Sequence, residues 1–363
     1  MTDPIPNRPG RRRALALTGL GVGAAVTAAV AAERILVRRA RAMPDRARHD
    51  DLAERPGPTR MIRSFDGTEI TLTEIGPTES TVEPVRTLVF CHAFTLDMTA
   101  WHYQWKELSK RYGCVLYDHR SHGRIGRAGE GGYSIQALGQ DLKRVLDATV
   151  EGPPAALIGH SMGGMAIASL AEMFPEEFGT RVRGAVFANT AAADVLKAII
   201  GNLGVRASQV LLPVARRITA NSLRGYRIRS SVFRGQADLA FPIARLSNFG
   251  STASPSIIDH VVRLSGQVPL DVWTELITSM FEMDLGEALS NVRVPSLVLV
   301  GDVDRLTPPS SALALKRRLP DARMIVFRDV GHCAMLEHPD EFNRVVEEFL
   351  AGAFAPAPEI VST

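Results

Sequence analysis

From Arg60 onward, short apolar runs alternate with longer amphipathic stretches along the sequence. The apolar runs, such as residues 86–92 (RTLVFCH) and 155–160 (AALIGH), have the length of strands that are buried on both faces. The stretches between them have helical spacing, and one of them starts behind Ser134, a residue type that caps helices. Strands that alternate with helices of ten or more residues predict a largely parallel sheet with helices on both faces.

Two departures from this alternation add detail. Asp66–Gly67 separates two alternating runs and predicts a β-hairpin at the start of the folded region. Between residues 191 and 286 the alternation stops, and the sequence there favours helices, which we interpret as an inserted helical cap. We expect the following organisation: 1–40 basic and apolar segment, 41–59 linker, 60–190 core, 191–286 cap, 287–354 rest of the core, 355–363 frayed tail.

The basic residues are unevenly distributed. The net charge of the chain is +3, but residues 1–60 contain twelve Arg, no Lys and only six acidic residues. A basic tail on a nearly neutral body argues against nucleic acid as a partner, because nucleic-acid binding needs the basic surface on the folded domain. Three cysteines, Cys91, Cys114 and Cys333, form neither a disulfide framework nor a metal-binding spacing.

The N-terminal segment predicts an association with a membrane or with an export pathway. Arg11–Arg13 precede nineteen uncharged residues, 14–32, which are rich in Ala and Gly. This length suffices for a membrane anchor. The basic start is also typical of an export signal of the twin-arginine type, and a helical extension of a soluble protein is the third interpretation. We expect the protein to be anchored or exported rather than cytoplasmic.

The sequence Gly159-His160-Ser161-Met162-Gly163 lies between a predicted buried strand and a predicted helix. This G-x-S-x-G pattern is typical of a nucleophile elbow, a turn so sharp that it needs glycines around the serine. The turn would expose the Ser161 hydroxyl at the carboxyl end of the strand. The N–H of Met162 would then point to the position where an oxyanion forms.

A serine nucleophile needs a base, and the base needs an acid that orients it. In this architecture the expected chain order is Ser, then Asp or Glu, then His. Asp302 and Asp304 follow one late predicted strand, and His332 follows the last one. The order is met, and each residue lies at the carboxyl end of a strand, where open α/β sheets build their sites.

These motifs resemble those of the α/β-hydrolase-fold superfamily over residues 60–354. The resemblance implies a mostly parallel eight-stranded sheet flanked by helices, with an inserted helical cap. Gly301, Asp304 and Pro308 are similar to the family's acid loop, so the resemblance selects Asp304 over Asp302 as the acid, and it selects His332 as the base.

The stretch FCHAFTLDMTAW resembles the family's first oxyanion loop, which implies that the N–H of Phe94 is the second oxyanion donor. Ala93 departs from the glycine that is usual there. His92 and His160 are expected mainly to brace the loops beside the site, and Trp101 to pack in the core. All three are also candidates for the wall of a substrate pocket.

The implied activity is that of a serine hydrolase that cleaves carboxylic esters through an acyl-enzyme, with no cofactor and no metal. Its expected partner is a small-molecule ester with an apolar acyl group, with possible membrane association through residues 14–32. Thioester, amide and C–C cleavage and cofactor-free perhydrolysis remain open, because one fold hosts many reactions. A receptor-like protein with slow turnover and a purely structural module are the alternatives outside enzymology.

Overall fold

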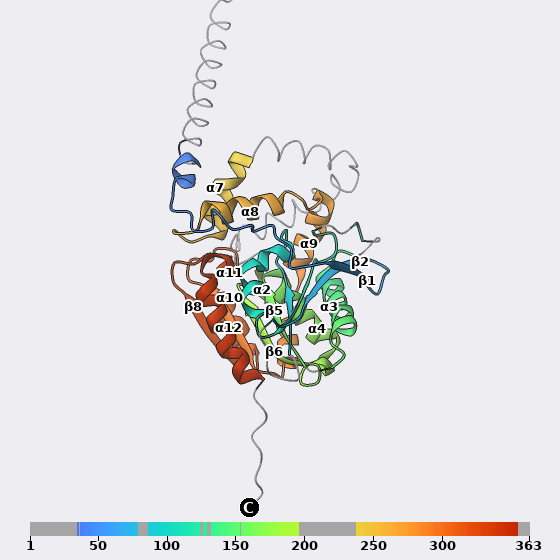
Figure 1. Cartoon of the computed structure of the whole chain (residues 1–363). Helices are drawn as coiled ribbons and strands as arrows, with labels where there is room; N and C mark the ends of the chain where they lie inside the picture. The colour runs from blue at the N-terminus through green and yellow to red at the C-terminus, as the bar shows by residue number, and fades with distance from the viewer. Residues whose placement is uncertain are drawn as a thin grey trace, which may run out of the picture.

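The computed structural model describes residues 35, 37–78, 86–123, 126–128, 132–152, 154–195 and 237–354. Its centre is an eight-stranded sheet with the order β1-β2-β4-β3-β5-β6-β7-β8 (Figure 1). The strands are β1 (Thr59–Arg63), β2 (Glu69–Ile75), β3 (Thr87–Cys91), β4 (Gly113–Tyr117), β5 (Ala155–His160), β6 (Val182–Ala188), β7 (Ser296–Gly301) and β8 (Ala322–Phe327). The pairs from β4 through β8 are parallel, and β2 pairs antiparallel with β1 and β4. The predicted fold class is confirmed.

The predicted hairpin forms the antiparallel edge of the sheet. β1 and β2 pair in register from Thr59 with Thr73 to Arg63 with Glu69. Gly67 in the turn has φ +82°, a conformation that favours glycine, and the Asp66 carboxylate accepts from the N–H of Thr68 at 3.0 Å. Asp66 and Gly67 therefore form the hairpin turn that the sequence predicts at this position.

Central strands are apolar on both faces because each face carries its own helical layer. In β3, Val89 contributes to one buried cluster and its neighbour Phe90 to the other. Helices α3, α4 and α10 cover the first face, and α2, α11 and α12 cover the second (Figure 1). Two fully buried layers explain why strand residues such as these are continuous apolar runs rather than alternating ones.

The described helices are bounded as follows. They are α2 (His102–Leu108), α3 (Ile135–Thr149), α4 (Met162–Met173), α7 (Ala237–Asn248), α8 (Pro255–Ser265), α9 (Leu270–Glu282), α10 (Pro309–Arg318), α11 (Ala334–Glu337) and α12 (Pro339–Ala353), with short 3₁₀ turns at Met98–Trp101, Pro175–Glu177 and Ala288–Asn291. The hydroxyl of Ser134 caps α3 by accepting from the N–H of Ala137 at 3.1 Å, as the sequence predicts.

Helices α7, α8 and α9 occupy the part of the predicted cap that the structure describes. They lie together at one end of the molecule, above the body that holds the sheet (Figure 1). Of the predicted cap, residues 191–195 and 237–286 are described, and residues 196–236 lie outside the described residues.

Residues 37–58, which we call the N-terminal strap, run along the body toward β1. Ala47 and Leu52 are buried in the same cluster as α8 and α12. The backbone N–H of Arg46 donates to the Ser254 hydroxyl at 3.1 Å, next to the start of α8. The segment that the sequence predicts as a linker is thus held against both the core and the cap helices.

No helix among the described residues is long and apolar enough to span a membrane. The predicted anchor or export segment, residues 14–32, and the predicted tail, residues 355–363, lie outside the described part of the chain.

Candidate active site

Ser161 occupies a sharp turn between β5 and α4. Its φ of +52° and ψ of −115° are sparsely populated for a residue with a side chain, so the conformation stores strain. The surrounding backbone holds it there: the N–H of Ser161 donates to the carbonyl of Ala188 at 3.0 Å, and its own carbonyl accepts from the Thr190 hydroxyl at 2.6 Å. Strain at this position, fixed on both sides, points to a functional serine.

The glycines around Ser161 permit the close packing of the turn. A Cβ at Gly163 would lie 2.0 Å from the carbonyl oxygen of Cys91 in the neighbouring strand. A Cβ at Gly159 would lie 2.6 Å from the backbone nitrogen of Gly164. Both contacts are with backbone, which cannot move aside, so these positions exclude any other residue.

His332 and Asp304 form a hydrogen-bonded pair. His332 Nδ1 lies 2.9 Å from Asp304 Oδ2, and both side chains are buried. They follow β8 and β7 respectively, at the same edge of the sheet as Ser161. An ionised carboxylate can only accept, so Nδ1 carries the proton and Nε2 is the nitrogen left to act as a base.

Asp304 is held as a carboxylate by several donors. Its Oδ2 accepts from Asn189 Nδ2 at 2.9 Å and from the Thr307 hydroxyl at 2.8 Å, and its Oδ1 accepts from the N–H groups of Leu306 and Thr307 at 2.9 Å. Burial acts to raise the pKa of Asp304, but the His332 ring and these hydrogen bonds outweigh it and hold the pKa below its ordinary value.

The loop that carries His332 is fixed from three directions. The N–H of His332 donates to the carbonyl of Asn248 at the end of α7 at 2.7 Å, and its carbonyl accepts from His160 Nε2 at 2.7 Å. Glu337 accepts from the N–H of Gly331 at 2.9 Å and from that of Gly250 at 2.7 Å. Burial raises the pKa of Glu337 to about 7 in spite of these donors.

The loop after β3 presents Phe94 to the same site. Thr95, the next residue, has φ +63°, which is a genuine outlier for a β-branched side chain. The N–H of Thr95 donates to His122 Nε2 at 3.2 Å. His122 therefore fixes the loop from which the proposed Phe94 donor projects.

Neutral histidines with defined tautomers support this loop. His92 Nε2 accepts from the N–H of His119 at 2.9 Å, so His92 Nδ1 carries the proton and donates to the carbonyl of Ala93 at 2.8 Å. Burial lowers the pKa of His119 to about 3, and burial together with the His332 ring lowers that of His160 to about 3. Burial also lowers the pKa of His92. These rings act as hydrogen-bonding braces.

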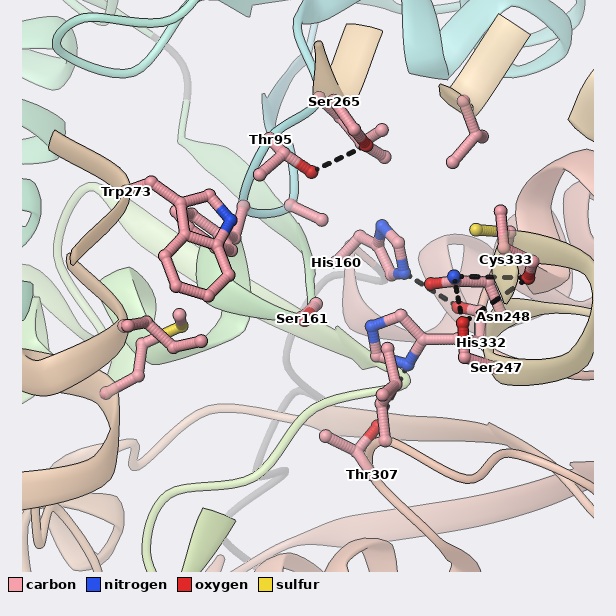
Figure 2. A pocket seen from close by; sticks show the side chains of 18 of the residues that line it. Thr95, His160, Ser161, Ser247, Asn248, Ser265, Trp273, Thr307, His332 and Cys333 are labelled. Carbon is pink, nitrogen blue, oxygen red and sulfur yellow. Dashed lines mark hydrogen bonds between the residues drawn. The ribbon is translucent and has the colours of Figure 1, made fainter. Parts of the chain in front are cut away.

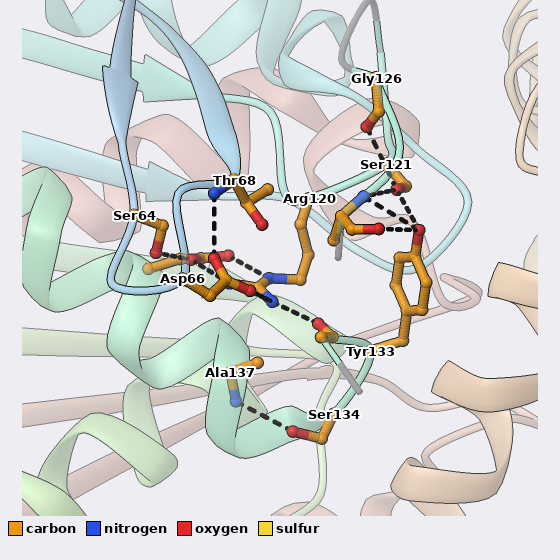
Figure 3. Close-up of polar contacts among 12 residues, drawn as sticks. Ser64, Asp66, Thr68, Arg120, Ser121, Gly126, Tyr133, Ser134 and Ala137 are labelled. Atoms are coloured by element: carbon orange, nitrogen blue, oxygen red, sulfur yellow. Dashed lines mark hydrogen bonds and ion pairs between the residues drawn. The ribbon is translucent and has the colours of Figure 1, made fainter. Parts of the chain in front are cut away.

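Behind the site, the segment after β4 is fixed by a buried ion pair. Arg120 is fully buried and donates to both carboxylate oxygens of Asp141, at 2.7 and 2.6 Å, and to Asp66 at 3.0 Å (Figure 3). Ser64 also donates to Asp141. The arginine thereby ties the β1–β2 turn, α3 and the His119–His122 stretch into one unit.

A cavity of about 430 Å³ connects these elements (Figure 2). Ser161, His160 and His332 line it together with Phe94, and none of the described lining residues is charged. Two hydrogen-bonded pairs of polar side chains lie in this lining away from the catalytic loops (Figure 2). The hydroxyls of Thr95 and Ser265 lie 3.0 Å apart, and Asn248 Nδ2 donates to the Ser247 hydroxyl at 2.8 Å. The apolar wall comes mainly from the cap helices: Ala240, Ile243, Ala244, Val261, Val262, Trp273, Ile277, Met280 and Phe281.

The remaining predicted pocket residues, His92, His160 and Trp101, lie in different positions relative to the cavity. His160 lines the cavity, whereas His92 lies behind the loop that it braces. Trp101 is fully buried and packs against Phe90 and Phe342 instead of lining the cavity. The tryptophan in the cavity wall is Trp273, from α9. Asp302 is exposed, whereas Asp304 contacts His332.

Three residues near the acid and the base escape sequence reasoning: Asn189, Thr307 and Glu337. Asn189 follows β6 and has φ +46°, a conformation that Asn tolerates better than most residues. Asn189 lies directly after a predicted strand, and this position in the sequence indicates a residue at the site-forming edge of the sheet. Among the described residues, no group of three or more His, Cys, Asp or Glu side chains is arranged to hold a metal ion.

Residues 88–345 match the model of the alpha/beta hydrolase family. The chain is 27% identical over 267 residues to the AB hydrolase superfamily protein YisY of Bacillus subtilis strain 168, covering 73% of this chain and 91% of that protein. It is 24% identical to the 3-oxoadipate enol-lactonase 2 of Acinetobacter baylyi, covering 72% and 86%. Among solved structures, a thermophilic esterase from Thermogutta terrifontis superposes with a TM-score of 0.61 at 20% identity, covering 82% of this chain and all of that one.

Proposed function

The chain belongs to the alpha/beta hydrolase family, and on this premise we propose that it is a serine esterase with Ser161, His332 and Asp304 as its catalytic residues. The observation that carries the proposal is the buried 2.9 Å contact between His332 and Asp304, at the cavity that Ser161 also lines. Together they supply a nucleophile, a base and an acid that orients the base.

The proposed reaction starts with proton transfer from the Ser161 hydroxyl to His332 Nε2 as Oγ attacks the ester carbonyl. Asp304 stabilises the imidazolium that forms and keeps the ring in the required tautomer. His332 then returns the proton to the leaving alcohol, which leaves an acyl group on Ser161. Water, deprotonated by the same histidine, releases the acid and restores the serine.

The backbone supplies the proposed oxyanion hole. Met162 is the first residue of α4, so its N–H is one of the amides that a helix start leaves without an intrahelical acceptor. Phe94 faces the cavity from the opposite loop, which His122 and Thr95 position. Each such donor contributes roughly 10²–10³ in rate.

The cavity supports a neutral substrate with an apolar acyl group. Phe94, Trp273 and Phe281 offer aromatic surface, and no charged side chain among the described lining residues is available to pair with a carboxylate on the substrate. An ester without a charged acyl chain therefore fits best.

The first test is the labelling and kinetics of a Ser161→Ala variant. We expect a fluorophosphonate probe to label the wild type but not the variant, and hydrolysis of a series of p-nitrophenyl esters to fall by on the order of 10⁶. Ser169→Ala is the matched control, because Ser169 is a buried serine of the same helix α4. Activity that survives in Ser161→Ala contradicts the assignment.

The series separates the alternatives when thioesters, C–C substrates and peroxide with a carboxylic acid are added to it. Stoichiometric labelling without turnover of any ester indicates a slow receptor-like protein. Faster turnover of thioesters, of C–C substrates or of peroxide with a carboxylic acid reassigns the reaction while the three catalytic residues stay in place. Wild-type activity that rises with acyl chain length supports the apolar pocket.

For the N-terminal segment, we propose a membrane anchor formed by residues 14–32, whose nineteen uncharged residues support it. Cell fractionation of the full chain and of a variant that lacks residues 1–34 tests this. Release of both forms into the soluble fraction contradicts the anchor, and cleavage near residue 32 in the full chain indicates an export signal instead.

A further inference from the structure

Three large apolar side chains are exposed at the end of the molecule that carries α7. Leu246 and Ile243 of α7 are 64% and 66% exposed, and Ile35, just before the N-terminal strap, is 52% exposed. The strap and α7 are in contact, because the Arg41 guanidinium lies 5.1 Å from the centre of the Phe241 ring (Figure 1). Single exposed apolar residues need no explanation, but grouped ones mark an interaction site.

The beginning of the strap is rich in arginine, and one of these arginines, Arg41, pairs with Asp259 of α8 at 3.2 Å. Arg38, Arg39, Arg46 and Arg48 are all exposed at the beginning of the strap. Asp45 is the single acidic residue among positions 35–48, and its carboxylate already accepts from the Ser256 hydroxyl at 2.6 Å. A bilayer with anionic lipids has an apolar interior and a negatively charged surface. Exposed apolar side chains beside arginines complement both parts of it.

The cavity reaches this face. Ile243, Ala244 and Ser247 of α7 line the cavity that contains Ser161, and Ile243 is at the same time one of the most exposed apolar residues. One side of α7 therefore borders the substrate cavity, while Leu246 points to solvent. Ile243 therefore places an apolar side chain at the boundary between the α7 surface and the cavity.

The chain itself leads to this face. The uncharged residues 14–32 end three residues before Ile35, so whatever the N-terminal segment contacts is brought close to the α7 surface. We define the docking face as Ile35, Arg38, Arg39, Ile243 and Leu246.

We propose that the docking face rests on a lipid surface that contains anionic headgroups, so that the substrate cavity opens toward the bilayer and takes a neutral ester dissolved in it. The choice of substrate rests on the proposed esterase function, whereas the docking of the face does not. The basic residues select a lipid surface over a second copy of this chain, because two copies would bring like charges together.

The docking is tested with a fluorophore at position 246. All three native cysteines are buried, so Leu246→Cys in the full chain can be labelled selectively with an environment-sensitive dye. Met61→Cys is the matched control, since Met61 is also 64% exposed but lies in β1. We expect the emission at position 246 to shift to shorter wavelength with vesicles of phosphatidylcholine and phosphatidylserine, and the emission at position 61 to stay unchanged.

Two outcomes overturn the docking proposal. One is an unchanged emission at position 246 while the protein still co-sediments with the vesicles, because the N-terminal segment alone then holds the chain. The other is a shift that depends on protein concentration without vesicles, which assigns the face to a second copy. In the variant that lacks residues 1–34, where the proposed anchor no longer holds the chain, Arg38→Ser and Arg39→Ser are each expected to weaken binding to phosphatidylserine vesicles about fivefold, with little change for pure phosphatidylcholine.

The substrate source is tested by kinetics. Leu246→Asp is expected to lower hydrolysis of a long-chain ester dissolved in vesicles by on the order of tenfold, and to leave a short water-soluble p-nitrophenyl ester unaffected. Met61→Asp is expected to change neither. Equal loss on both substrates contradicts the proposal. If the wild type hydrolyses no ester at all, the proposed function fails, while the fluorescence result still decides the docking face.

Discussion

The residues that prepare His332 for its proposed role are small polar side chains from separate parts of the chain. Asn189 and Thr307 both donate to Asp304, and Asn189 also donates to the carbonyl of Gly331, next to the histidine. This arrangement keeps the carboxylate ionised and the ring in one tautomer. Asp302, two residues from the acid, faces solvent and takes no part in it.

The two aspartates of this loop are expected to differ sharply in a mutational test. Asp304→Asn should lower kcat on p-nitrophenyl esters by roughly 10⁴, because an amide at this position stabilises the wrong tautomer of His332. Asp302→Asn should change kcat by less than about twofold, since its side chain is exposed. A large loss for Asp302→Asn with normal Asp304→Asn kinetics would show that the other carboxylate is the acid.

Among the elements, the contact of greatest consequence joins the hairpin, α3 and the segment after β4 through Arg120. Burial alone acts to lower the pKa of Arg120, but the hydrogen bonds and charge of Asp141 and Asp66 raise it, so the guanidinium stays charged. Burial raises the pKa of Asp141, opposed by Arg120. Each partner is therefore tolerated inside the protein only because the other is present.

Arg120→Met is expected to lower the free energy of unfolding by about 3–5 kcal/mol, because it leaves the Asp141 carboxylate buried without its partner. Urea denaturation measures this. The double variant Arg120→Met with Asp141→Leu removes both charges and should recover a large part of the loss. A double variant that is less stable than Arg120→Met would show that the hydrogen bonds, not the unpaired charge, determine the cost.

On the scale of the whole molecule, the N-terminal strap is linked to the core by ion pairs and, through a hydrogen bond of the core, to the cap helices. Arg55 of the strap contacts Asp118 at 3.2 Å and Asp97 at 3.4 Å, both of them buried. Thr99 donates to Asp97 and lies 3.2 Å from His260 of α8. Burial and the neighbouring Asp97 raise the pKa of Asp118 to about 6, and Arg55 opposes them.

These contacts predict how stability depends on pH. The native state binds the Asp118 proton more tightly than the unfolded chain, so this group contributes most below its ordinary pKa of 3.8, and the contribution is lost as pH rises through about 6. Arg55→Met should raise the pKa of Asp118 further, enlarge this loss and cost about 3–5 kcal/mol at neutral pH.

Denaturation of Arg55→Met at pH values on either side of this range checks the prediction. Arg344→Met is the control, because the Arg344–Glu348 pair on α12 is about half exposed on both sides and should contribute little. If the free energy of unfolding of Arg55→Met equals that of the wild type at every pH, these charges do not hold the strap in place.

The sequence by itself determined the parts that depend on local chemistry. The β1–β2 turn follows from Asp66–Gly67, the start of α3 from Ser134, and the strained turn from the glycines around Ser161, because each is set by residues within a few positions. The continuous apolar runs determined the parallel sheet, since strands that are covered by helices on both faces have apolar side chains on both faces.

The tertiary structure alone decided which side chains meet. Asn189 and Asp304 are 115 positions apart, and Thr95 and Ser265 are 170 apart, so no local pattern can pair them. It also placed Trp273 rather than Trp101 in the cavity wall, because both tryptophans are apolar and helix packing selects between them. Propensities act over a few residues, whereas a site at the edge of a sheet is assembled from chain segments that folding alone brings together.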